Sequence, residues 1–253
     1  MQTLAGRVGV VTGASTGIGA AVARALAAAG MSVVLGARRA DRLAAVCDEI
    51  RAAGGTADAV ATDMRDEGQV DRLLASAVER HGRLDALVNN AAIGTVRTIA
   101  DGHTDEWRAI LETNVLGTLI ACRAALRHML PQSCGDILNM TSASAHEAWP
   151  YLAVYAGSKA AIHAISRGLR AEVAGRGLRV MTIEIHNVGG TDFASNFEPA
   201  LMPAAIARWV ELGLLSRESP MITADDVARA VVFQLSQPNP ASVHHLTIRS
   251  RAN

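Results

Sequence analysis

A glycine-rich turn near the amino terminus constrains the fold of this chain more than any other feature. The run Arg7 to Val11 leads into Thr12-Gly-Ala-Ser-Thr-Gly-Ile-Gly19, and the Ala-rich stretch Ala20 to Ala29 follows. Strand, glycine turn and helix in this order suit a dinucleotide, because glycines let the backbone approach a pyrophosphate at a helix start. A second strand at 31–36 completes a βαβ unit of about 30 residues. Alone, the turn is a weak signal that also fits an ordinary tight connection.

The alternation of strands and helices continues along the chain without a linker. We expect strands near 7–12, 31–36, 56–61, 84–88, 135–141, 178–184 and 243–248, and helices near 17–29, 39–53, 67–81, 104–130, 152–174 and 224–236. This rhythm predicts an α/β protein with a doubly wound, mostly parallel, seven-stranded sheet of the Rossmann type. Residues 1–253 are predicted to form a single domain.

The charge balance and the apolar stretches bear on possible partners. Lys and Arg total 24, as do Asp and Glu, so the net charge is zero. Neutrality argues against nucleic acid or an anionic membrane surface as a partner. Charges interrupt the apolar stretches short of the roughly 18 residues that a membrane span needs. We therefore expect neither nucleic-acid binding nor membrane insertion.

The cysteines, the histidines and the amino terminus favour a cytoplasmic protein without a metal. Cys47, Cys122 and Cys134 are scattered and odd in number, so we expect reduced, buried thiols. His244 and His245 are adjacent, and strand alternation sends them to opposite faces. The first residues lack the charged and apolar regions of a signal peptide. We predict no metal site and a cytoplasmic location.

Tyr155 and Lys159 suggest acid–base chemistry. They stand four positions apart in a predicted helix and share one face, and Ser142 lies thirteen positions before Tyr155. A phenol with a pKa of about 10 is a poor base at neutral pH, and a nearby ammonium would lower that pKa. The pair could exchange a proton with an alcohol or carbonyl. A lone Tyr-x-x-x-Lys also occurs by chance on surface helices, so context decides.

That context resembles the short-chain dehydrogenase/reductase family. The residues that carry the resemblance lie in the family's order and approximate spacing: Thr12-Gly-x-x-x-Gly17-Ile18-Gly19, Asp63, Asn89-Asn90-Ala91, Asn114, Ser142 and Tyr155-x-x-x-Lys159. The tail Ala224 to Ile248 is similar to the branch of NADP-dependent 3-hydroxy acid and clavulanate-type dehydrogenases.

The resemblance implies four catalytic residues. Tyr155 would act as the general acid in reduction and the base in oxidation. Lys159 would lower the Tyr155 pKa and bind the nicotinamide ribose, and Ser142 would donate to the substrate oxygen. Asn114 would kink the long helix and hold a water that connects Lys159 to solvent. Ser144 rivals Ser142 if the strand continues, although the interval to Tyr155 favours Ser142.

The end of the second strand indicates which cofactor is preferred. NAD-using relatives place an acid at the position of Ala37, and no acid occurs before Asp41. Arg38 follows, as in NADP-using relatives, and its planar fork suits a 2′-phosphate. Thr16 stands where some of those relatives carry a second basic residue. We predict NADP(H) over NAD(H), the alternative being that Arg38 and Arg39 are solvated residues opening a helix.

Other cofactor contacts follow from the resemblance. Asp63 would meet the adenine amino group, although it could equally cap the next helix. Asn90 would line the adenosine side, while Asn89 would tie strands together. The full predicted cofactor set is Gly13, Ser15, Thr16, Gly17, Ile18, Gly19, Arg38, Arg39, Asp63, Met64, Asn90, Ala91, Tyr155, Lys159, Val188 and Thr191.

The segment after the sixth strand departs from the family pattern. Ile185-His186 stands at the usual Pro-Gly, and Thr191 comes about one residue late. A rerouted loop using Gly189 and Gly190 is the favoured interpretation, and contact of His186 with substrate or cofactor is the other. The candidate substrate residues are Ser144, His146, Trp149 and His186.

Residues 190–220 break the βα rhythm and carry many apolar side chains. An insertion at this place could form a substrate lid beyond the carboxyl ends of the strands, or simply a helical pair packed on the domain. We predict a lid.

The sequence thus favours an NADP(H)-dependent oxidoreductase that interconverts a secondary alcohol or hydroxy acid and its carbonyl. The alternatives are a catalytically silent nucleotide-binding regulatory protein, or a dehydration or epimerisation on the same scaffold. By family analogy the chain forms a homo-oligomer, a tetramer or dimer.

Overall fold

Seven parallel strands form one sheet in the computed structural model, which describes residues 3–215 and 220–251. The strand order is β3-β2-β1-β4-β5-β6-β7. The strands are β1 (Val8–Thr12), β2 (Ser32–Ala37), β3 (Ala57–Ala61), β4 (Ala86–Asn89), β5 (Gly135–Ser142), β6 (Leu178–Ile185) and β7 (His245–Ile248). The predicted doubly wound α/β fold is confirmed, and every pairing in the sheet is parallel.

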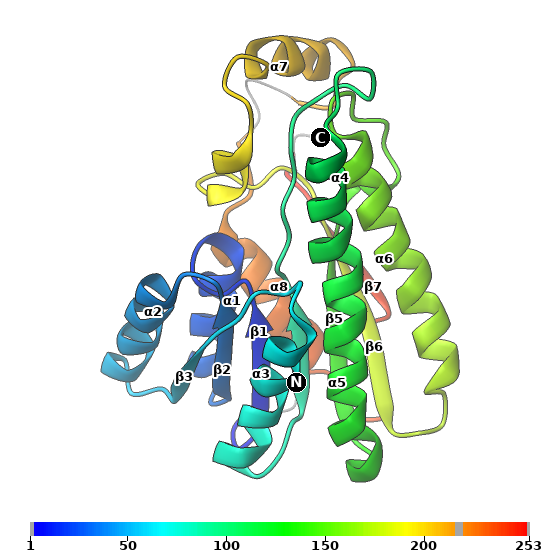
Figure 1. The fold of residues 1–253 in the computed structure, drawn as a ribbon. Helices are drawn as coiled ribbons and strands as arrows, with labels where there is room; N and C mark the ends of the chain where they lie inside the picture. The colour runs from blue at the N-terminus through cyan, green and yellow to red at the C-terminus, as the bar shows by residue number, and fades with distance from the viewer. Residues whose placement is uncertain (1–2, 216–219, 252–253) are drawn as a thin grey trace.

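Helices cover both faces of the sheet (Figure 1). They are α1 (Gly17–Ala28), α2 (Ala40–Ala52), α3 (Glu67–His81), α4 (Thr104–Leu111), α5 (Gly117–Gln132), α6 (Ala153–Glu172), α7 (Met202–Glu211) and α8 (Ala224–Leu235). Strand β1 is buried along its whole length, as expected for a parallel strand with helices on both sides.

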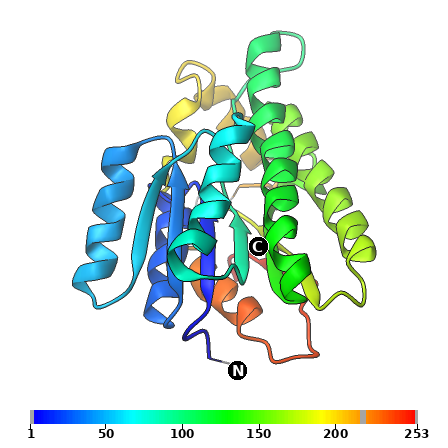
Figure 2. The ribbon, with the colours of Figure 1, turned by 60° about the horizontal axis from the view of Figure 1, so that its bottom comes forward.

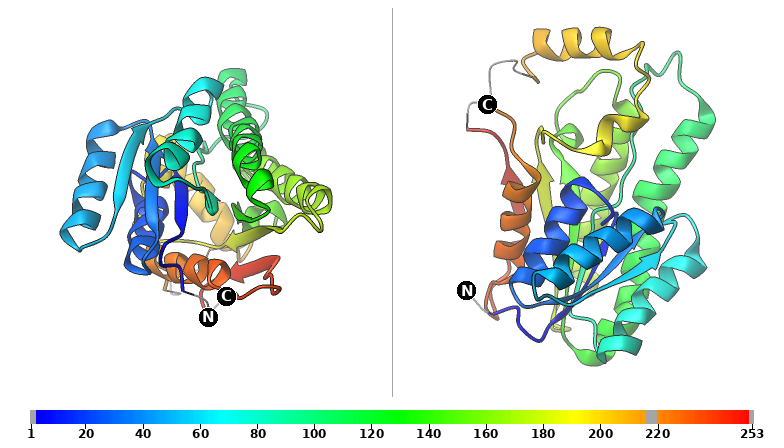
Figure 3. Two further views of the ribbon diagram at one scale, coloured as in Figure 1. Left: turned by 90° about the horizontal axis from the view of Figure 1, so that it is seen from below. Right: turned by 90° about the vertical axis from the view of Figure 1, so that its left-hand side faces the viewer.

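The helices form two layers, seen from further directions in Figures 2 and 3. On one face α1 packs against α8, and Leu26, Leu43 and Val231 contribute to a core of aliphatic side chains. On the other face α3 packs against α5, with Leu73 and Met129 in a second core. The two cores thus bury both faces of the sheet, and the loops at its carboxyl edge extend from buried strands.

A π-helical turn interrupts the helix that was predicted over 104–130. Glu112–Leu116 (η1) separates α4 from α5, and Asn114 is buried within it. Single π-turns inside helices often occur at functional sites. The run Thr104–Gln132 has 29 residues and a mean hydropathy of 1.4 in its most apolar window, so by length and composition it could cross a membrane. Charged residues such as Glu112 and Arg123 interrupt this run, as expected from the sequence, and half of that window is buried inside the protein.

Residues 190–215 form short helices beyond one end of the sheet (Figure 1). A 3-10 turn, Asp192–Asn196 (η3), precedes α7. Trp209 of α7 packs edge-on against Trp149, their ring centroids 5.5 Å apart, within a small apolar cluster. The rest of the predicted lid, 216–219, lies outside the described residues.

The cysteines agree only in part with the prediction. All three are free, and Cys47 and Cys122 are buried, but Cys134 is exposed where α5 gives way to β5. Its place in a surface turn, rather than on a core-facing position, explains the difference.

Candidate active site

The turn after β1 needs its glycines for steric reasons. Gly13 and Gly17 have φ values of +66° and +54°, which side chains with a Cβ disfavour. A Cβ on Gly19 would lie 2.3 Å from the Gly13 carbonyl oxygen. The Asn90 Nδ2 donates to the carbonyl oxygens of Thr12 (2.9 Å) and Gly13 (3.2 Å), so the turn is fixed to the end of β4. The backbone of the Gly13–Gly19 turn therefore packs closely against the start of α1, where a side chain larger than glycine would not fit.

A cavity of about 580 Å³ opens at the carboxyl edge of the sheet. Every residue predicted to bind the cofactor lines it, from Gly13 in the first turn to Thr191 after β6. The predicted substrate residues Ser144, Trp149 and His186 also line it, whereas His146 does not. Asn114 lies behind the cavity wall rather than on it. The strand order explains this convergence, since the loops after parallel strands meet at one edge.

Arginines gather where β2 ends. Arg39 donates to the Thr16 hydroxyl (3.0 Å) and faces Asp192 of η3 (3.4 Å), which also accepts from Arg42 (2.9 Å). Arg38 is exposed, lines the cavity, and makes no hydrogen bond or ion pair within the described residues. The Arg39 guanidinium is therefore held by Thr16 and Asp192. The Arg38 guanidinium remains available to a ligand.

Asp63 lines the cavity and does not cap α3. The helix cap is Asp66, whose carboxylate accepts from the Gln69 backbone N–H. A hydrogen bond from Arg65 lowers the pKa of Asp63, which keeps the carboxylate ionised and able to accept. The capping alternative for Asp63 was wrong, because the chain makes a further turn before the helix begins. The Asn89 Nδ2 donates to the Asn139 Oδ1 (2.8 Å), so Asn89 ties β4 to β5 as predicted.

The Tyr155, Lys159 and Ser142 side chains meet at the cavity wall. Tyr155 and Lys159 lie on one face of α6, with the Lys159 Nζ 5.7 Å from the centre of the Tyr155 ring. The same Nζ donates to the Met140 carbonyl oxygen (3.1 Å), which anchors it to β5. Ser142 ends that strand and hydrogen-bonds the Tyr155 phenol. Helix and strand therefore present a phenol and a hydroxyl to the same point.

Burial governs the pKa values of this pair. It raises the pKa of Tyr155 to about 12, opposed by the Ser142 hydrogen bond, and lowers the pKa of Lys159 to about 8. The lowered phenol pKa expected from the sequence is not what this geometry gives, because loss of hydration outweighs the effect of the Ser142 hydrogen bond. Tyr155 is consequently protonated at neutral pH and can donate.

Asn114 supports the site from behind. Its Nδ2 donates to the Ile93 carbonyl oxygen (2.9 Å) and the Ser158 hydroxyl (3.0 Å), and its Oδ1 accepts from the Ile93 N–H (2.9 Å). The amide thus joins the π-turn to the segment after β4 and to α6. A π-turn stands at Asn114 in the long helix, while the predicted kink and the water relay stay predictions.

Ser144 does not continue the strand. β5 ends at Ser142, and a 3-10 turn, Ala143–Ala145 (η2), follows. The Ser144 hydroxyl still donates to the Ser142 Oγ (3.0 Å), and both residues line the cavity. Ser144 is therefore placed to orient the Ser142 hydroxyl.

The loop after β6 combines features of both interpretations. Gly190 has a φ of +70°, as a rerouted loop requires, and Thr191 reaches the Gly17 turn. His186 lines the cavity, yet only 7% of its side chain is exposed, and its Nε2 lies 3.7 Å from Glu184 Oε1. The His186 imidazole is thus mostly buried beside Glu184, and only a small part of it borders the cavity.

Some residues of the site escaped prediction as individuals. Phe193 of η3 packs on Tyr155 with ring centroids 5.0 Å apart, although the sequence indicated only an apolar segment. His163 and Glu184 lie near His146, outside the cavity lining. The signal for His163 was its position four residues after Lys159 on the same helix.

Known proteins resemble this chain along nearly its whole length. The family model described as short chain dehydrogenase matches residues 7–201. An uncharacterized oxidoreductase of Staphylococcus saprophyticus is 33% identical over 250 residues, covering 98% of this chain and 99% of the relative. The closed form of a serine dehydrogenase complexed with NADP+ superposes with a TM-score of 0.87 at 26% identity, covering 97% and 96% of the two chains. A short chain dehydrogenase from Burkholderia cenocepacia in complex with NADP gives 0.83 at 33% identity, with 98% of each chain covered.

Proposed function

Because this chain belongs to the short-chain dehydrogenase family of oxidoreductases, we propose that it interconverts a secondary alcohol or hydroxy acid and its carbonyl with NADP(H). The observation that carries the proposal is the meeting of Tyr155 and Ser142 in the same cavity as the Gly13–Gly19 turn. The silent regulatory alternative has no comparable support, since its only hint was the altered Ile185-His186 segment.

The residues present fit a dinucleotide. A Cβ at Gly19 would collide with the Gly13 carbonyl, so the turn keeps the close backbone approach that a pyrophosphate requires. The α1 start offers N–H groups without helical partners, and Asp63 and Arg38, which we expect to meet the adenosine, line the same cavity. When bound, the nicotinamide supplies or accepts the hydride.

The protein's part in carbonyl reduction is to bind the oxygen and deliver a proton. The substrate oxygen would accept hydrogen bonds from the Ser142 Oγ and the Tyr155 phenol, which stabilise the developing negative charge. The phenolic proton then moves to that oxygen, leaving a phenolate near the Lys159 ammonium. In oxidation the phenolate takes the proton back. Lys159, anchored to Met140, holds a positive charge beside this exchange.

We base the proposed preference for NADP(H) over NAD(H) on the residues at the end of β2. Ala37 offers no carboxylate for a ribose 2′-hydroxyl, and Arg38 lines the cavity without a hydrogen bond or ion pair to any residue that the structure describes. The relatives solved with NADP are consistent with this preference.

The test of the proposed function is a coupled absorbance assay. Purified protein should oxidise NADPH in the presence of some members of a panel of ketones, keto acids and aldehydes, and should do so far more slowly with NADH. Turnover of none of the panel, with NADPH binding intact, would favour the silent alternative. Equal kcat/KM for the two cofactors would contradict the NADP(H) assignment while leaving the reaction in place.

We further propose that residues 190–215 act as part of a lid over the substrate. Phe193, Phe197 and Ile206 line the cavity, and Phe193 covers the Tyr155 ring. Replacing Phe193 by Ala should raise the KM for the carbonyl substrate about tenfold, because burial of one aromatic side chain is worth roughly 1.5–3 kcal/mol. NADPH affinity should change little. Phe233→Ala, at an exposed position of α8, is the matched control, and an unchanged substrate KM in Phe193→Ala would remove this residue from the lid.

A homo-oligomer remains part of the proposal. The large apolar side chains Leu111, Leu116 and Leu119 are exposed along the α4–α5 run, which supports burial of this face against another copy.

A further inference from the structure

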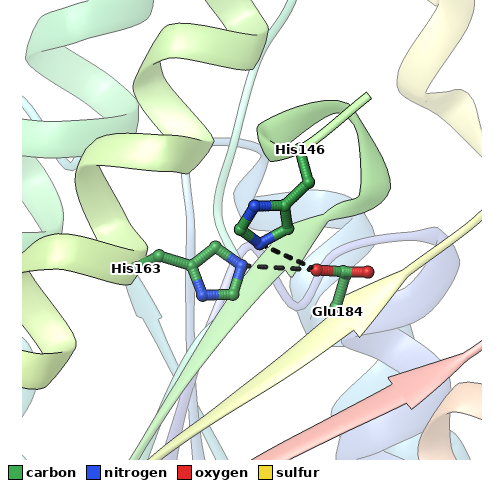
Figure 4. A group of neighbouring side chains, drawn as sticks. All are labelled: His146, His163 and Glu184. Carbon is green, nitrogen blue, oxygen red and sulfur yellow. Dashed lines mark ion pairs between the residues drawn. The ribbon is translucent and has the colours of Figure 1, made fainter. Parts of the chain in front are cut away.

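Three residues far apart in the sequence gather beside the active site, outside the cavity lining (Figure 4). His146 follows η2, His163 lies on α6, and Glu184 lies on β6. The His146 Nε2 is 3.2 Å from Glu184 Oε2, and the His163 Nε2 is 3.6 Å from the same oxygen. One ligand atom from each residue lies within 4.8 Å of the other two. Three separate elements thus direct nitrogen and oxygen atoms at one point.

The spacing of these atoms suits a tetrahedral ion. Zinc binds imidazole nitrogen and carboxylate oxygen at about 2.0–2.2 Å, which places neighbouring ligand atoms about 3.3–3.5 Å apart. The two distances to Glu184 Oε2 fall close to that range. Two histidines and one carboxylate are also a donor set that zinc and related divalent transition metals prefer.

A second observation is a buried nitrogen that makes no hydrogen bond, although it lies within ion-pair distance of Glu184. The His163 side chain is 10% exposed, and its Nε2 is buried without a hydrogen-bond partner. Buried polar atoms in folded proteins nearly always have a partner, and an unpaired one calls for an explanation. A simple hydrogen-bonded trio would bring this nitrogen within bonding distance of Glu184, but at 3.6 Å it does not. An ion between the three residues would satisfy it.

We propose that His146, His163 and Glu184 bind one divalent transition metal ion of the zinc class. The fourth position would be held by water, since 58% of the His146 side chain is exposed and leaves a route for the ion. The expectation of no metal did not consider these residues, which stand 17 and 21 positions apart in the sequence and are brought together by the packing of α6 on β5 and β6.

The ion would act as a clamp, without a part in hydride transfer. It would tie the segment that follows Ser142 to α6 and β6, and that segment carries Ser144 and Trp149 into the cavity. Metal binding should therefore stiffen the substrate side of the site. The proposal rests on the cluster geometry alone and does not depend on the reaction.

The experiment titrates Zn²⁺ into metal-free full-length protein in competition with a chromophoric chelator, and Co²⁺ into the same protein to record the visible band of a tetrahedral site. One ion should bind per chain, and the melting temperature should rise. His146→Gln should weaken binding about 100-fold or more, since it removes one of three ligands. Because His146 is at the surface, the metal-free variant should keep the wild-type melting temperature. Glu184→Gln should show the same loss.

Two control variants test whether the ion binds at His146, His163 and Glu184 and not at another residue. His103→Gln removes an exposed histidine elsewhere, and Cys134→Ser removes the exposed thiol. Both should bind Zn²⁺ and give the Co²⁺ band as wild type does. No binding at one equivalent, binding that His146→Gln leaves unchanged, or binding that Cys134→Ser abolishes would each overturn the proposal.

Discussion

Replacing Tyr155 by Phe is expected to lower kcat for carbonyl reduction by at least about 10²-fold, the contribution of a positioned acid–base group. The variant keeps the ring that packs against Phe193 and loses only the oxygen that Ser142 contacts. NADPH binding, measured by fluorescence titration, should therefore remain close to wild type. Single-turnover NADPH oxidation at saturating substrate isolates the chemical step.

Tyr151→Phe is the matched control, because it removes the same atom from the chain's other tyrosine. Tyr151 has a φ of +68° and packs beside Trp149 in the apolar cluster, away from Ser142. Its rate should be near that of wild type. If Tyr155→Phe also retained near full rate, the proton would have to come from another group, and Ser142 would be the next candidate.

The predicted fold followed from features that are local in sequence. The Thr12–Gly19 turn and the apolar strands fixed the βαβ rhythm, and a wholly parallel sheet then brought the loops after β1, β4 and β6 together. Residues at strand ends, such as Ser142, could be placed in the site because the carboxyl edge of the sheet is common to all strands. For the same reason every predicted cofactor residue lines one cavity.

What escaped prediction depends on contacts between distant segments. The partner of Arg39 is Asp192, 153 residues away, so nothing in the sequence showed that this arginine is engaged while Arg38 is not. The Tyr155 pKa depends on how deeply the fold buries the phenol, which periodicity does not reveal. The position of His146 beside Glu184 likewise follows from tertiary structure alone.

Replacing Arg38 by Asp is expected to reverse the cofactor preference. The wild-type guanidinium lines the cavity with no ion pair in the described part of the chain, so a 2′-phosphate would not have to displace a carboxylate. Asp removes a charge-assisted contact worth about 1.5–3 kcal/mol, adds repulsion toward phosphate, and supplies an acceptor for a ribose 2′-hydroxyl. The kcat/KM with NADPH should fall about 100-fold and that with NADH should rise.

Steady-state assays with both cofactors separate this effect from a general change in charge. Arg108→Asp makes the same charge change at an exposed residue of α4 outside the cavity lining, and should leave the preference intact. Arg39→Asp tests the neighbour: its guanidinium already serves Thr16 and Asp192, so the loss of NADPH preference should be smaller than for Arg38. A larger loss in Arg39→Asp than in Arg38→Asp would transfer the phosphate contact to Arg39. An unchanged cofactor preference in both variants would mean that the residues after β2 do not distinguish a ribose 2′-phosphate from a 2′-hydroxyl.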